Sequence, residues 1–204
     1  MSVARSLHSP NDSEKRRTSV MTNTAPEATI ELQRNSLYIM TQNGPSADFE
    51  GFHWAIICTD AKTNGTSYEW SEVEGEKLAE SYKRNALAVG GQFTLSPSTI
   101  SLFHINGFLP PSSADLEQDE FEAQFFENVF PESFSTISDN RAHGVTSRTW
   151  VLRVLGAMKD CGFLYREGTI ADLATRVEEV SAEQENLMKG LGSGKSFQPL
   201  VIDI

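Results

Sequence analysis

Residues 51–73 read GFHWAIICTDAKTNGTSYEWSEV and hold the clearest pattern in the chain. In the first nine of these residues, bulky apolar side chains such as Trp54 recur at every second position, which is the period of a β-strand. Asn64-Gly65 is a hairpin-turn dipeptide, and residues 66–73 return to a period of two. The stretch therefore predicts two antiparallel strands joined by a tight turn.

Further strands are predicted on both sides of this hairpin. Residues 37–41 form an apolar run that ends at an Asn-Gly-Pro turn signal, so the first three strands are expected to form an antiparallel meander. Residues 93–95 and 100–105 also have strand character. The polar segment 74–88 predicts a short helix instead.

The C-terminal half has helical patterns. A helix is expected from an N-cap at Ser113 to about residue 128, followed by a loop over residues 131–144. Residues 147–161 place their apolar side chains on one helical face, and Thr169 opens a last helix that fades near residue 190. We therefore expect an α+β fold, with an antiparallel sheet packed against C-terminal helices.

One domain is expected over residues 35–190. Residues 1–34 are polar and lack periodicity, so we predict a disordered N-terminal tail, and residues 191–204 are expected to be a C-terminal tail.

Composition excludes several classes of partner. The formal net charge is −11 and the pI is about 4.8, which argues against a nucleic-acid-binding face and against docking on anionic membranes. No apolar run approaches the roughly 20 residues of a membrane-spanning helix. Two cysteines cannot make a disulfide framework and have no metal-type spacing, which favours a reducing, cytoplasmic setting. No metal or cofactor is expected.

Two residues carry the chemical interest. His53 lies within a strand, on the face opposite the neighbouring aromatic side chains. Ser147 lies where a loop meets a helix, and free N–H groups at a helix N-terminus can stabilise an oxyanion. The alternatives are structural: His53 is a half-buried histidine with ordinary partners, and Thr146 or Ser147 is the N-cap of the helix.

The run FHWAII at residues 52–57 resembles the histidine strand of permuted papain-like thiol hydrolases and acyltransferases, the lecithin:retinol acyltransferase group. Residues 146–151 then match the position of that group's cysteine at the start of a helix. Gly144 and the run SRTWV at residues 147–151 also resemble a G-x-x-C-R-x-W-V motif of an uncharacterised family of fungal proteins. The resemblance covers about residues 37–165 and implies a permuted papain-like arrangement.

Ser147 departs from the pattern, because the resembling families have cysteine there. Three interpretations follow: a serine variant that still transfers acyl groups, a pseudoenzyme that binds a ligand, or an engineered change from cysteine to serine.

The resemblance implies amide or ester hydrolysis or acyl transfer on a small-molecule or acyl substrate. Ser147 is the expected nucleophile and His53 the general base, with Glu69 or His104 orienting the imidazole ring. The other candidates are expected to contact the substrate: Trp54, Trp70, His143, Arg148 and Trp150. The alternatives are ligand binding without turnover, or an interaction module in which the acidic last helix forms a homodimer.

Overall fold

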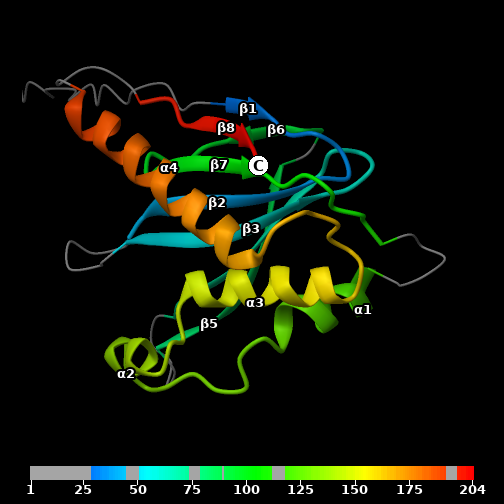
Figure 1. Ribbon diagram of the computed structural model, residues 1–204, viewed down its shortest axis with the longest axis vertical. Helices are drawn as coiled ribbons and strands as arrows, with labels where there is room; N and C mark the ends of the chain where they lie inside the picture. Colours follow the sequence, from blue (N-terminus) through cyan, green and yellow to red (C-terminus); the bar gives the residue numbers. More distant parts are fainter. Residues whose placement is uncertain (1–28, 45–50, 74–78, 89, 112–117, 192–196) are drawn as a thin grey trace, which may run out of the picture.

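The computed structural model describes residues 29–44, 51–73, 79–88, 90–111, 118–191 and 197–204 (Figure 1). Most of the predicted tail at residues 1–34 lies outside these described residues, as does the predicted N-cap Ser113.

A six-stranded sheet forms the centre of the molecule, in the order β5-β4-β3-β2-β7-β8. The pairs are antiparallel except for β7 and β8, which run parallel. A second sheet pairs β1 with β6. The strands have these bounds: β1 (Thr29–Glu31), β2 (Leu37–Asn43), β3 (Phe52–Thr59), β4 (Gly65–Glu72), β5 (Glu80–Ala88), β6 (Gln92–Thr94), β7 (Thr99–His104) and β8 (Leu200–Asp203).

The predicted meander is confirmed, because β2, β3 and β4 are neighbours in chain order. The turn between β3 and β4 is held by Asp60. Its carboxylate accepts hydrogen bonds from the backbone N–H groups of Lys62 and Asn64 at 2.7 and 2.8 Å. These bonds lower the pKa of Asp60, although its slight burial opposes them as the largest single contribution. The local turn chemistry therefore sets where the hairpin reverses.

Helices cover one face of the sheet. They are α1 (Gln118–Glu122), the π-helical turn η1 (Ala123–Glu127), α2 (Ile137–Ala142), α3 (Ser147–Asp160) and α4 (Ile170–Gly190). Figure 1 shows α4 crossing the sheet at β7 and β2, with α3 beside it. The main core lies between these helices and the sheet face that carries Trp54, Ile56 and Trp70. A smaller core on the other face joins Ala55 and Ile57 to residues near β1 and β6.

The expected α+β fold, with a mostly antiparallel sheet and C-terminal helices, is confirmed. The last helix begins as predicted: Thr169 is its N-cap and forms a reciprocal capping box with Asp172. The first residue of the helix predicted from residue 147 is also correct. Among the described residues, no helix has the length and apolar character to cross a membrane.

Three local predictions were wrong. The helix predicted in residues 74–88 is a strand over its described part, because β5 pairs with β4 along its length. Tyr82 packs against the core, but polar residues beside it obscure the alternation of apolar and polar side chains that would indicate a strand. The predicted loop over residues 131–144 contains α2, whose N-cap Thr136 accepts a hydrogen bond from the Asp139 N–H. The helix expected to end near residue 128 is a single α-turn followed by η1.

Both expected tails contain a strand. β1 lies within residues 1–34 and β8 lies within residues 191–204. β8 adds to the open edge of β7, where the backbone N–H and C=O groups would otherwise be unpaired.

Candidate functional site

Strands β3 and β4 separate at one end of the sheet. Their pairing stops at Ala55 and Glu69, whereas β3 continues along β2 to Phe52 and β4 continues along β5 to Glu72. We call this opening, between residues 52–54 of β3 and 70–72 of β4, the fork. The predicted residues His53 and Trp54 lie on one side of it, and Trp70 lies on the other.

Ser147 lies at the fork. Its Oγ accepts a hydrogen bond of 3.2 Å from the Trp54 N–H, and the residue is 2% exposed. The serine hydroxyl therefore supplies the acceptor that β4 would provide if the two strands stayed paired. Thr146 is the N-cap of α3 and accepts a hydrogen bond from the Thr149 N–H, so the N-cap alternative holds for Thr146 rather than for Ser147.

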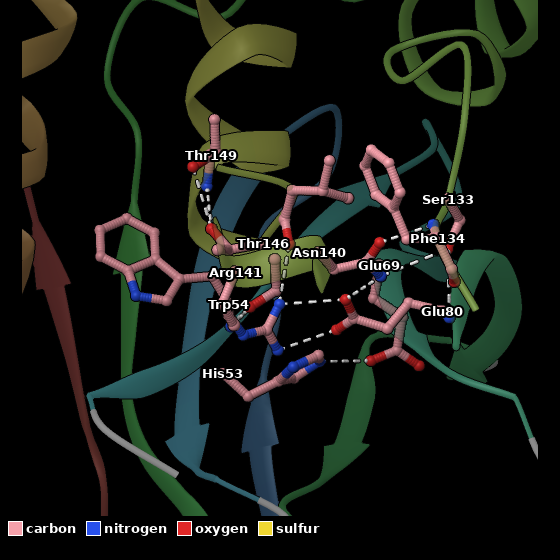
Figure 2. Close-up of polar contacts among 12 residues, drawn as sticks. His53, Trp54, Glu69, Glu80, Ser133, Phe134, Asn140, Arg141, Thr146 and Thr149 are labelled. Carbon is pink, nitrogen blue, oxygen red and sulfur yellow. Dashed lines mark hydrogen bonds and ion pairs between the residues drawn. The ribbon is translucent and has the colours of Figure 1, made fainter. Parts of the chain in front are cut away.

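His53 bonds to Glu69, one of the two side chains that were expected to orient its ring. The distance from Nε2 to Oε2 is 2.9 Å, and both side chains are largely buried (Figure 2). Asn85 Nδ2 donates to the other oxygen of Glu69 at 3.2 Å. The hydrogen bond from His53 lowers the pKa of Glu69, and the charge of Lys83 contributes, against the opposing effect of burial.

The tautomer of His53 follows from this contact. An ionised carboxylate has no proton to donate, so Nε2 must carry the hydrogen that joins the pair. In the neutral ring, Nδ1 is then a hydrogen-bond acceptor. Among the described residues, Nδ1 has no hydrogen-bonding partner.

His53 and Ser147 approach the fork from opposite faces of the sheet. Glu69 pairs with Ala55, so His53 shares the face of Ala55, whereas Trp54 points into the core beneath α3. Figure 2 shows the side chains of His53 and Trp54 extending to opposite sides of β3. The hydroxyl of Ser147 bonds to the Trp54 backbone rather than to the imidazole, so the structure does not join the expected nucleophile and base.

An unpredicted ionic network lies beside the fork. Glu80, at 2% exposure, accepts hydrogen bonds from Arg141 at 2.9 and 3.0 Å and from Asn140 at 2.7 Å (Figure 2). Arg141 also donates to the backbone carbonyl of Val145, two residues before α3. Sequence reasoning missed this network, because Arg141 lay in an expected loop and Glu80 in an expected helix. The sequence shows only that Glu80 and Arg141 carry opposite charges. They are 61 positions apart, and no pattern in the sequence indicates that they form a pair.

Two cavities meet this region. The first, of about 440 Å³, lies on the His53 side, and the second, of about 400 Å³, lies beside the start of α3. Arg141 contributes to both walls. The first cavity is lined by Gln42, Asn43, Gly44, His53, Glu69, Ser71, Glu72, Glu80, Ser98 and Arg141. The second is lined by Gly51, Phe52, Trp54, Arg141, Thr146, Ser147, Arg148, Glu178 and Ala182.

Two of the predicted histidines lie elsewhere. His104, the other candidate orienter, bonds through Nδ1 to Asp203 at 2.7 Å, in the pairing of β7 with β8. His143 donates from Nδ1 to the Asp139 carbonyl at 2.8 Å and stacks on Phe134, with ring centroids 4.2 Å apart. Neither lines the cavity that contains His53.

The expected aromatic contacts are mostly core residues. Trp54, Trp70 and Trp150 are each at most 5% exposed. Arg148 forms an ion pair with Glu178 of α4 and lies 5.9 Å from the centre of the Trp54 ring. These contacts fix α3 against the sheet and α4.

The chain matches no protein-family model, no curated protein and no solved structure. Within the described residues, no group of three or more His, Cys, Asp and Glu side chains is placed to hold a metal ion.

Proposed function

We propose that this protein binds a small polar molecule in the cavity at the fork, with His53 as the central contact. The observation that carries this proposal is the His53–Glu69 pair, in which the carboxylate orients a ring that lines a cavity. Nδ1 of this ring has no hydrogen-bonding partner in the part of the chain that the structure describes. A cavity of about 440 Å³ is large enough for a small metabolite.

Binding is favoured over direct hydrolysis by the position of Ser147. A serine nucleophile needs a base within hydrogen-bond reach of its hydroxyl. Here the hydroxyl accepts from the Trp54 N–H on the α3 side, while His53 bonds to Glu69 on the other side. This geometry supports the ligand-binding alternative more directly than the acyl-transfer hypothesis.

Saturation-transfer NMR tests the binding function. A panel of small amines, carboxylates, polyols and nucleosides is screened against the full chain, His53→Leu and His143→Leu. At least one class should bind the wild type and His143→Leu but not His53→Leu, because His143 lies outside the cavity. Circular dichroism checks that both variants fold. The proposal is wrong if no class binds, or if binding persists unchanged in folded His53→Leu.

Acyl transfer through Ser147 is a second candidate. The observation that favours it is again the His53–Glu69 contact, which is the arrangement of a general base and its orienting group. It requires the Ser147 hydroxyl to leave the Trp54 N–H and the fork to rearrange, because His53 and Ser147 lie on opposite faces of the sheet.

Intact-mass spectrometry after incubation with p-nitrophenyl acetate tests this second candidate. Ser147→Cys should gain an acetyl group faster than the wild type, which carries the same background cysteines, Cys58 and Cys161. The gain should disappear when His53→Leu is added. Equal acetylation of all three proteins would rule out acyl transfer through position 147 and leave ligand binding as the proposed function.

A further inference from the structure

We infer that the molecule bound at the fork carries a primary amine or another cationic hydrogen-bond donor. This inference rests on the binding function proposed above and names the chemical class of its ligand. It follows from the charge of the cavity lining and from the hydrogen-bonding groups that the lining leaves unused.

The charge of the lining is negative. Its described residues include three carboxylates, from Glu69, Glu72 and Glu80, and one guanidinium, from Arg141. Arg141 holds Glu80 through two N–H groups, so this pair compensates itself. Lys83 is outside the lining and donates to the backbone carbonyl of Glu72.

Two of these carboxylates, those of Glu69 and Glu72, differ in their hydrogen-bonding partners. Glu69 has a lowered pKa and accepts hydrogen bonds from His53 and from Asn85. The carboxylate of Glu72 is exposed at the rim and accepts no hydrogen bond from the described residues. An anionic ligand would therefore meet repulsion from both groups, whereas a cation would be attracted to the rim.

Two polar groups of the lining, which have no hydrogen-bonding partner among the described residues, can accept a hydrogen bond. His53 Nδ1 is an acceptor when the ring is neutral and Nε2 donates to Glu69. Ser71 Oγ, one strand away, is buried and has no hydrogen-bonding partner among the described residues. An ammonium group supplies three N–H donors and no acceptor, so it matches this set of groups. A buried hydroxyl without a partner costs free energy, which a donor from the ligand would offset.

Matched probes separate charge from shape. Butylamine, 1-butanol and butyrate have the same chain length and differ in the charge of one end. Each is titrated into the full protein at neutral pH and low salt while the His53 imidazole signals are followed by ¹H–¹³C NMR. We expect a saturable shift with butylamine, binding at least about fivefold weaker for 1-butanol, and no shift with butyrate.

Two variants locate the effect. Glu72→Gln removes the rim charge, and because this side chain is exposed the fold should tolerate it. It should weaken butylamine binding by about fivefold. Glu179→Gln removes an exposed charge from α4, outside both cavities, and should leave binding unchanged.

The outcomes distinguish the ligand class from the site itself. If 1-butanol or butyrate shifts His53 as strongly as butylamine, the amine inference is wrong and the binding function survives. If no probe of any charge shifts His53, and the broader panel also fails to bind, both are wrong. Equal losses in Glu72→Gln and Glu179→Gln would overturn the inference, because the attraction would then be a property of the whole acidic surface.

Discussion

Arg141→Ala should destabilise the protein strongly, because it leaves a buried carboxylate without its main partner. The side chain of Glu80 is 3% exposed and takes two N–H groups from Arg141. Removing one partner of a buried ion pair typically costs about 3–5 kcal/mol. Asn140 would still donate to Glu80 at 2.7 Å, so we expect the lower half of that range. In a domain of this size the loss corresponds to a fall in Tm of roughly 6–16 °C.

Urea unfolding followed by tryptophan fluorescence measures this cost. The control is Arg176→Ala, which removes an exposed ion pair with Glu179 at 3.9 Å and should cost less than about 0.5 kcal/mol. The double variant Glu80→Met/Arg141→Met removes both charges and should cost less than Arg141→Ala alone, since no carboxylate is left unpaired. An Arg141→Ala variant as stable as the control would refute the reasoning, as would a double variant that costs the sum of two large single losses.

Three further predictions concern the fork and its helices. Ser147→Ala should lower the free energy of unfolding by about 1–2 kcal/mol, because the Trp54 N–H loses its acceptor; an unchanged urea midpoint would contradict this. Glu69 has a lowered pKa in the folded state, so its contribution to stability is complete above its unfolded pKa and is lost as the pH falls through the folded value. Glu69→Gln should therefore flatten the acid limb of a plot of unfolding free energy against pH. An acid limb with the same slope as that of the wild type would contradict this prediction. Thr169→Ala should cost about 1 kcal/mol by removing the capping box of α4, whereas Thr169→Ser should retain most of the stability in the same urea assay.

Local patterns predicted the elements whose stabilising contacts are local in sequence. The alternation around Trp54 and the turn chemistry of Asp60 and Asn64 lie within one hairpin, and the Thr169 cap lies within one helical turn. The contact of Glu69 with His53 was also accessible, because neighbouring strands of a meander bring such positions together.

The rest of the site depends on contacts that no local pattern encodes. The fork exists because, beyond Ala55, β3 pairs only with β2 and β4 pairs only with β5. The alternation of side chains along β3 then places His53 on the face away from α3. Arg141 reaches Glu80 across 61 positions of the chain. The sequence predicted that His53 faces away from Trp54, but it did not predict that α3 and Ser147 cover the face that carries Trp54.

Four residues of the motif that suggested catalysis have structural roles in the fold. Ser147 replaces a strand as acceptor for the Trp54 N–H, and Arg148 ties α3 to α4 through Glu178. Trp150 and Val151 are fully buried beneath the sheet. A cysteine at position 147 would supply only a weak acceptor to the Trp54 N–H. A change between serine and cysteine would therefore alter how α3 packs at the fork as well as the reactivity of the side chain. In this chain the S-R-x-W-V run therefore has a structural role, which is to dock α3 at the fork, and any chemistry has to be argued separately from what faces His53.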